Sequence, residues 1–356
     1  MPITIKIATP RWCSFALLIV AVSFATPSDP ADKRVENDFF NYLTQSVCMD
    51  ALGRPMRGTP LDAGCQAKRS QIASDLAYYR KHDWPNINDA ERTRSGYQAS
   101  DSVLAERGGR TWILQTLDFG NPPRIFGKFD AGQGDGGQVL TVVDGWASAI
   151  MTEDGGAGVQ WFIGPGCRTA PKGDAGLSSW IFFGQVMRSG DWQSVVARLN
   201  RATSPTGCPT HFNTAYTRYR SDLIDLEFRL ISPTKDGQII SRKLDVIVSE
   251  HYAGEDMMHA DHLERFYFAR DFGLLRWERW ENFAISRQPD IGRMANLIAS
   301  SGRCRPVRYS EPPGQSWQMI DCRSWTMLVE QPANWSVDMY RWRALDALGP
   351  EAKGGD

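Results

Sequence analysis

The sequence predicts an α+β protein that is mainly β: a jelly-roll-like antiparallel β-sandwich with a helical N-terminal region and helical insertions. Short runs of alternating apolar and polar residues fill most of the chain from 111 to 283, as expected for half-buried strands. Clusters of Gly, Asp, Asn and Pro separate these runs, which is typical of turns between strands. Before residue 111 and after Gly190, apolar residues instead recur every three to four positions, which indicates helices.

The first 25 residues have the layout of a cleavable signal peptide. Lys6 and Arg11 precede an apolar run from Ser14 to Ala25, and no acidic residue occurs in this segment. The run has about a dozen residues, whereas a membrane-spanning helix takes about 20. We therefore expect cleavage after Ala25 and a secreted or periplasmic protein that is not embedded in a membrane.

The mature chain divides into a helical N-terminal region (26–110), a β-rich body (111–345) and a disordered tail (346–356). Asp29 and Pro30 form an N-cap and N1 pair for a first helix that runs to about Met49. A second helix is predicted over 62–81, because Ile72, Leu76 and Tyr79 recur at helical spacing.

The β-rich body contains predicted strands on both sides of a helical insert at about 190–220. These strands cover 111–119, 124–130, 138–144, 147–153, 158–164 and 180–186 before the insert, and 225–231, 243–251, 263–269, 274–283 and 324–331 after it.

Six cysteines remain once Cys13 leaves with the signal peptide. An even number of cysteines in an oxidising compartment indicates disulfides, and no metal-binding Cys spacing occurs. The cysteines fall into three sequence-local pairs, which predicts bonds between Cys48 and Cys65, Cys167 and Cys208, and Cys304 and Cys322. Thiol catalysis is not expected, because pairing accounts for every mature cysteine.

The charge balance argues against nucleic acid as a partner. Of the 41 acidic and 40 basic residues, the signal peptide removes two of the basic ones. A near-neutral chain provides no strong field for a polyanion or an anionic membrane. Twelve of the 13 tryptophans lie after residue 25. So high a tryptophan content indicates either a large hydrophobic core or an aromatic ligand-binding surface.

The segment 262–282 predicts a hairpin with a candidate ligand face. Asp271, Phe272 and Gly273 form a three-residue loop with Gly273 in the left-handed position, which pairs Arg270 with Leu274. Side chains alternate with period two along a strand, so this register places a mixed set of groups on one face. The set consists of His262, Glu264, Phe266, Phe268, Arg276, Glu278, Trp280 and Asn282.

This face suits a carbohydrate or another small polar ligand. An indole offers a flat apolar surface to a sugar ring, while acids and amides bind its hydroxyls. Glu264 and Glu278 are the candidate general acid and base for glycoside cleavage or a lyase-like reaction. Trp280, Arg276, His262 and Asn282 are the candidate substrate-binding residues. We therefore expect an exported carbohydrate-recognising protein, either a binding protein or a glycan-cleaving enzyme.

Two alternatives come from other classes. His251, His259 and His262, with Glu250 or Asp261, favour a metal-dependent hydrolase, because imidazole and carboxylate bind zinc and similar divalent ions. Apart from such a divalent metal, no cofactor is expected. The second alternative is a non-enzymatic structural or interaction protein of the envelope, whose tryptophans belong to the core.

Overall fold

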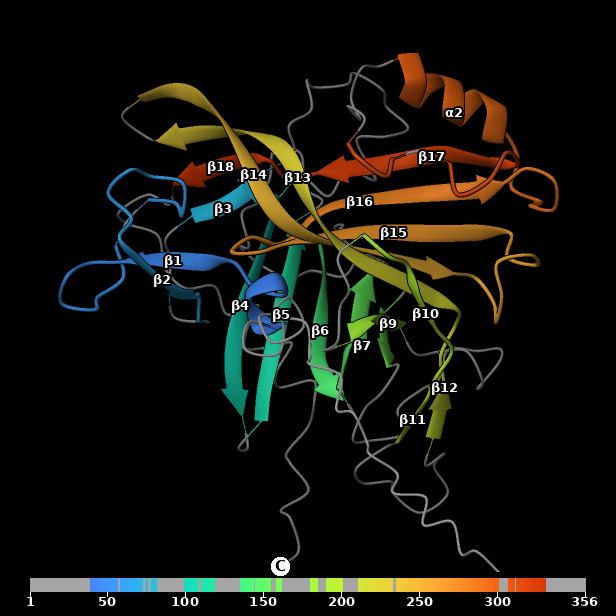
Figure 1. Cartoon of the computed structure of the whole chain (residues 1–356), viewed down its shortest axis with the longest axis horizontal. Helices are drawn as coiled ribbons and strands as arrows, with labels where there is room; N and C mark the ends of the chain where they lie inside the picture. The colour runs from blue at the N-terminus through green and yellow to red at the C-terminus, as the bar shows by residue number, and fades with distance from the viewer. Residues whose placement is uncertain are drawn as a thin grey trace, which may run out of the picture.

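The computed structural model describes residues 39–56, 58–72, 75, 78–81, 99–107, 110–118, 135–143, 145–154, 158–161, 180–184, 190–200, 211–232, 235–300, 307–310 and 312–330. Within the described residues the protein is mostly β, as the sequence predicts, and their mixed 14-stranded sheet curls into a nearly closed, barrel-like shape (Figure 1). The described strand order does not confirm the finer prediction of a jelly-roll-like sandwich.

The C-terminal half of the sheet consists of five antiparallel neighbours that carry the candidate site. Their bounds are Thr217–Ser232 (β13), Lys235–Tyr252 (β14), His262–Ala269 (β15), Gly273–Asn282 (β16) and Trp317–Ser324 (β17). The short strand β10 (Gln193–Val195) adds to β13, and helix α2 (Ile291–Ser300) packs against β17 (Figure 1).

The N-terminal half runs steeply across these strands (Figure 1). Its strands are Tyr78–Lys81 (β3), Ala99–Arg107 (β4), Arg110–Asp118 (β5), Asp135–Val143 (β6), Trp146–Asp154 (β7), Gly158–Trp161 (β8) and Trp180–Gly184 (β9). Strand β18 (Met327–Glu330) joins the halves, because it is parallel to β13 and antiparallel to β3. Two small sheets pair β1 (Ser46–Met49) with β2 (Ala67–Ser70) and β11 (Arg198–Asn200) with β12 (His211–Asn213).

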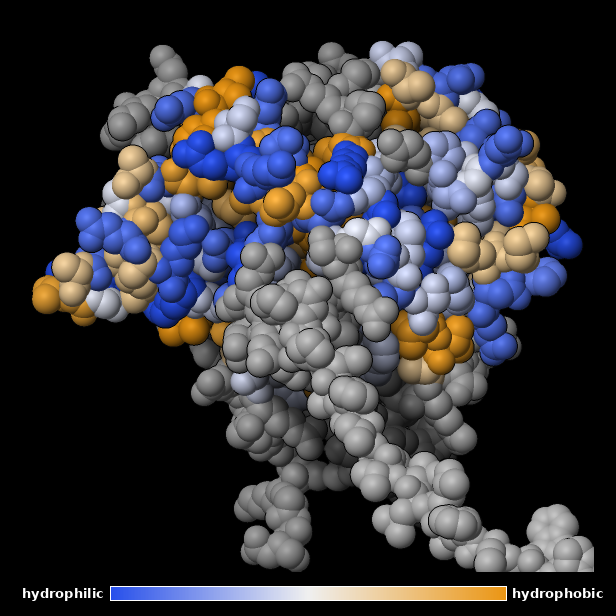
Figure 2. All heavy atoms as spheres, viewed as in Figure 1, coloured by the Kyte–Doolittle hydropathy of each residue, from blue (hydrophilic) through white to orange (hydrophobic). Residues whose placement is uncertain are grey.

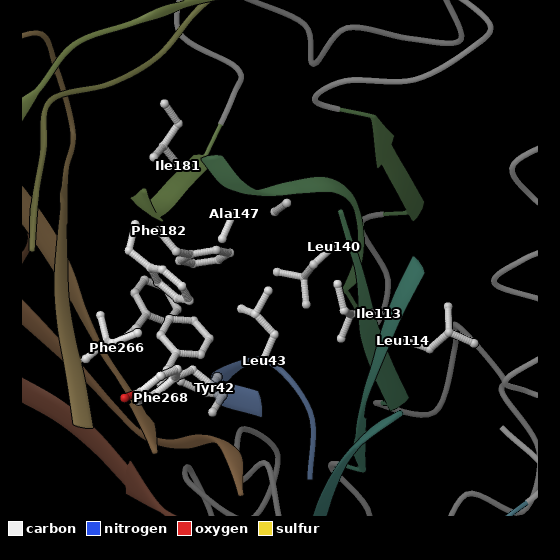
Figure 3. Packing of buried hydrophobic residues seen from close by; sticks show 14 of the residues in the cluster. Tyr42, Leu43, Ile113, Leu114, Leu140, Ala147, Ile181, Phe182, Phe266 and Phe268 are labelled. Atoms are coloured by element: carbon white, nitrogen blue, oxygen red, sulfur yellow. The ribbon is translucent and has the colours of Figure 1, made fainter. Parts of the chain in front are cut away.

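Apolar side chains from both halves fill the interior of the barrel-like sheet (Figure 3). Phe182 of β9 meets Phe266 and Phe268 of β15 edge-on, with ring centroids 4.9 and 5.1 Å apart. Leu140 and Ile113 complete the cluster from β6 and β5. Each such side chain contributes roughly 1.5–3 kcal/mol when fully buried, so this packing holds the two halves together.

The two predicted N-terminal helices are wrong over most of their described residues, with a short 3-10 turn at 39–42 as the helical part. Residues 46–49 and 67–70 pair as strands β1 and β2, and 78–81 form β3; the short 3-10 helix η1 (Phe39–Tyr42) precedes them. The segment from 42 to 48 is buried on all sides, including its polar residues, so no solvent face exists for an amphipathic helix. The backbone N–H of Gln45 donates instead to the Ser102 carbonyl of β4.

The helical insert is likewise wrong in its described parts, since 193–195, 198–200 and 211–213 are strands. In contrast, β5, β6, β7 and β13 to β16 confirm the strands predicted for those stretches. Residues 1–38, the predicted strand at 124–130 and the tail lie outside the described residues. Within the part that is described, no helix is long and apolar enough to cross a membrane.

The predicted Cys48–Cys65 disulfide is confirmed, with the two Cα atoms 5.3 Å apart. It links β1 to the segment that leads into β2, and not two helices. Cys322 is also disulfide-bonded, to a partner outside the described residues. Its predicted partner Cys304, and the predicted pair of Cys167 and Cys208, lie outside them too.

Candidate functional site

The β15–β16 hairpin has a different register from the predicted one. Gly273 has a positive φ of 66°, as predicted, but the loop lies one residue earlier, so that Ala269 pairs with Gly273. A bulge then inserts one extra residue in β16, next to the pair of Tyr267 and Arg276. Because side chains alternate between faces, one extra residue exchanges the faces of everything beyond it.

The two candidate catalytic carboxylates therefore lie on opposite faces of the hairpin. Glu264 pairs with Arg279, while Glu278 pairs with Arg265, the residue that follows Glu264 in β15. Glu264 accepts a hydrogen bond of 2.9 Å from the indole N–H of Trp277 on its own face. The predicted shared face of Glu264 and Glu278 is wrong, and the two carboxyl groups do not flank one ligand position.

Glu278 belongs to a buried ion cluster of Glu250, Arg265, Arg276 and Glu278, in which no residue is more than 4% exposed. The Arg265 guanidinium lies 2.7 Å from the Glu250 carboxylate and 3.3 Å from that of Glu278. Arg276 Nε lies 2.7 Å from Glu278 Oε1. The structure thus brings the predicted site residues Arg276 and Glu278 together, but inside the protein.

Neutral donors complete the hydrogen bonding of both carboxylates. The indole of Trp280 donates to Glu278 over 3.0 Å, and the hydroxyls of Ser310 and Tyr267 donate over 2.9 and 3.2 Å. Glu250 accepts from the hydroxyl of Tyr252 at 2.6 Å. Charge-assisted bonds of this kind are about twice as strong as neutral ones, and they offset the cost of burying the ions.

The cluster keeps both glutamates ionised. Burial raises the pKa of Glu278, but the Arg276 and Arg265 guanidinium groups outweigh it and hold the pKa below its ordinary value. For Glu250, Arg265 and Arg218 outweigh burial in the same way and lower its pKa. A general acid at neutral pH needs a raised carboxyl pKa, so these carboxylates suit a supporting role.

An aromatic and basic surface lies beside the cluster, next to β13 and β10. This arginine-aromatic surface consists of Trp192, Arg218, Arg220, Arg308 and Tyr309. The guanidinium carbons of Arg218 and Arg220 lie 4.5 and 4.4 Å from the centre of the Trp192 ring, and that of Arg220 lies 3.2 Å from the Tyr309 ring. Figure 2 shows mostly hydrophilic side chains where β10 crosses β13 and β14.

Contacts with the ion cluster hold this surface in place. Arg218 Nε lies 2.5 Å from Glu250 Oε2, which ties the surface to the buried carboxylate. The Tyr309 carbonyl accepts a hydrogen bond from Arg265. Tyr309 also has a positive φ of 73°, a strained conformation for an aromatic residue that only surrounding contacts can maintain.

The three histidines of the metal hypothesis differ in their environments. His251 is buried, and burial, together with nearby His262, lowers its pKa to about 3. His259 is exposed and hydrogen-bonds Asp256, whereas His262 is half-buried and bonds Asp261. Among the residues that the structure describes, no group of three or more His, Cys, Asp or Glu side chains is placed to hold a metal ion.

The remaining predicted residues have structural contacts. His251 pairs directly with Glu264 across β14 and β15, so these two lie on one face with His262. Trp280 is 3% exposed and packs in the apolar cluster around Tyr252. Asn282 is buried, and its amide oxygen accepts from the backbone of Ala284, which closes the turn after β16.

The arginine-aromatic surface was not predicted from the sequence. Arg218, Arg220 and Asp222 alternate on one face of β13, a period-two signal that marks a polar face. The predicted helical insert at about 190–220 includes Trp192, and no local signal identifies Tyr309, which lies in a loop before β17. Comparisons with protein-family models, curated proteins and solved structures find no match to this chain, so no residue role is transferred from another protein.

Proposed function

We propose that this chain is an exported carbohydrate-recognising protein and that its ligand binds at the arginine-aromatic surface. The observation that carries the proposal is the stacking of Trp192 and Tyr309 against three guanidinium groups on a partly exposed face. Export rests on the signal-like segment 1–25 and agrees with the disulfide chemistry of the mature chain.

The chemistry of this surface matches what a sugar presents. Aromatic rings supply flat apolar area for the C–H groups of a sugar ring, and guanidinium N–H groups donate to hydroxyl oxygens. Arg218 and Tyr309 are held by Glu250 and Arg265 of the ion cluster. Side chains that are fixed before binding lose little conformational entropy on binding, which favours affinity.

The proposed ligand position is the face of β13, and not the hairpin face predicted from the sequence. Trp280, Arg276 and Glu278 are each no more than 4% exposed, so a ligand cannot reach them without disrupting the cluster. Glu264 lies on the other face of the hairpin from Glu278. We therefore propose binding without glycan cleavage.

A glycan array with the mature, oxidised protein tests the proposal. We expect binding to a subset of glycans, and we expect Trp192→Ala to abolish it while far-UV circular dichroism stays unchanged. Phe283→Ala is the matched control, because Phe283 is an aromatic residue that is 51% exposed and lies outside the surface. A wild-type protein that binds no glycan rejects the function, and full binding by Trp192→Ala rejects the location.

A further inference from the structure

The arginine-aromatic surface carries more positive than negative charge. It presents the guanidinium groups of Arg218, Arg220 and Arg308, and the carboxylates paired with them are Glu250 and Asp222. We infer that the ligand carries an oxyanion, as in a uronic-acid or sulfated sugar, and that this group binds between Arg220 and Arg308. This inference rests on the proposed function and specifies its ligand class.

Among the three arginines of the surface, Arg220 has the positive charge that is least compensated by nearby carboxylates. Its Nη1 donates to the Gly190 carbonyl at 3.2 Å, and its Nε is buried without a hydrogen-bond partner among the described residues. No described carboxylate forms an ion pair with it, although Asp222 and Glu250 act on it from farther away. Burial lowers the pKa of Arg220, and this effect outweighs the opposing effect of Asp222 and Glu250. The two carboxylates therefore compensate the buried positive charge only in part.

Arg308 is available to a ligand. Its side chain is 64% exposed, and its ion pair with Asp222 has a length of 3.5 Å. Asp222 is only 13% exposed, but the pair is long and its Arg308 end faces solvent, so the Arg308 guanidinium can turn from Asp222 toward a ligand anion. Arg308 and Arg220 both contact the Tyr309 ring, at 5.3 and 3.2 Å, which places the two guanidinium groups around one aromatic side chain.

The shape of a guanidinium favours an oxyanion over a hydroxyl. Its planar N–H fork binds carboxylate, sulfate or phosphate oxygens in pairs, with bonds about twice as strong as neutral ones. Nucleic acid fits less well, because proteins that follow its backbone neutralise many phosphates with a series of cations. The formal net charge of this chain is −1, and the surface is one compact cluster.

Calorimetric titration with matched ligands tests the inference on the full mature chain. The first pair is trigalacturonic acid and its neutral methyl ester, and the second is one disaccharide with and without a sulfate group. We expect the acidic member of at least one pair to bind about tenfold more tightly, because hydrogen bonds to a charged group are stronger than those to a neutral group. The pair that responds identifies carboxylate or sulfate as the anion.

Variants distinguish the anion contact from general sugar binding. Arg308→Gln is expected to reduce affinity for the acidic sugar by about tenfold and leave affinity for the neutral one unchanged. Arg54→Gln is the control, because Arg54 is an exposed arginine in the turn after β1. Arg220→Lys keeps the charge but loses the fork, so we expect an intermediate loss.

The outcomes separate this inference from the proposed function. If acidic and neutral sugars bind equally well and Trp192→Ala abolishes both, the inference of an anionic ligand is rejected. The proposed carbohydrate recognition is then supported. An absence of binding to any sugar rejects both. Equally tight binding of a single-stranded oligonucleotide also overturns the inference, because it shows affinity for polyanions in general.

Discussion

Arg265 and Glu278 are direct cross-strand partners on β15 and β16, with the guanidinium 3.3 Å from the carboxylate and neither side chain more than 2% exposed. Burying an ion costs several kcal/mol, and attraction repays this only when the remaining polar atoms are also bonded. Here Trp280, Ser310 and Arg276 supply those bonds to Glu278. The stability of the hairpin therefore depends on a complete set of partners.

Glu278→Gln is expected to lower the free energy of unfolding by about 3–5 kcal/mol, because it leaves the buried charges of Arg265 and Arg276 undercompensated. Urea denaturation followed by tryptophan fluorescence measures the change. Glu255→Gln is the control, since Glu255 is exposed, and it should stay within about 0.5 kcal/mol of the parent. A Glu278→Gln protein as stable as the parent would show that the cluster is not a stabilising unit.

Removing the Cys48–Cys65 disulfide is expected to cost about 3 kcal/mol, the chain-entropy value for a loop of about 15 residues. The double variant Cys48→Ala/Cys65→Ala, studied without reductant so that Cys322 stays bonded, isolates this bond. Differential scanning calorimetry should show a lower Tm. An unchanged Tm would mean that burial of β1 alone fixes this segment.

Much of the β structure could be predicted from the sequence because alternation reflects a local property of a strand, its two unlike faces. Strands β14, β15 and β16 are where the alternating runs predict them. Segments buried on both faces carry no such signal. Thr44, Gln45 and Ser46 are fully buried polar residues at the start of β1. Gln45 and Ser46 hydrogen-bond to Ser102, Gln71 and Asp271, which are distant in the sequence and which no local pattern reports.

The candidate site was harder to predict because its geometry depends on one non-local detail. The bulge in β16 moves Glu278 to the face opposite Glu264, and no residue type marks a bulge in the sequence. Trp192, Arg220 and Tyr309 come from three separate parts of the chain and meet only after the sheet has formed. Their proximity is therefore visible only in three dimensions.

Gly273→Ala is expected to destabilise the protein by about 1–3 kcal/mol, the cost of a strained backbone at a non-glycine residue. Gly273 has a φ of +66°, and an added Cβ would lie 3.1 Å from both the Leu43 carbonyl oxygen and Ser102 Oγ. Chemical denaturation measures the loss. Gly292→Ala is the control, because a Cβ there meets no atom within 4 Å. Equal stability of the two variants would contradict the tight packing at this loop.

Acid is expected to weaken the fold through His251 before it affects the carboxylates. Burial, with a smaller effect of His262, lowers the folded-state pKa of His251 from 6.5 to about 3. The unfolded chain therefore binds a proton below pH 6.5 that the folded chain does not. Stability from the neutral imidazole is complete above pH 6.5 and is lost as the pH falls toward 3, with a slope that approaches about 1.4 kcal/mol per pH unit.

Urea denaturation at several pH values between 6.5 and 5 isolates this effect, because Glu250 and Glu278 have pKa values below their ordinary 4.5 and stay ionised there. The contribution of these two carboxylates to the free energy of unfolding is present above pH 4.5 and is lost only at lower pH. His251→Gln should flatten the slope in this range, whatever its stability at neutral pH, because no group at that position takes up the proton. His259→Gln should keep the parent slope, since His251 is retained. A His251→Gln slope equal to that of the parent would assign the acid sensitivity to another group.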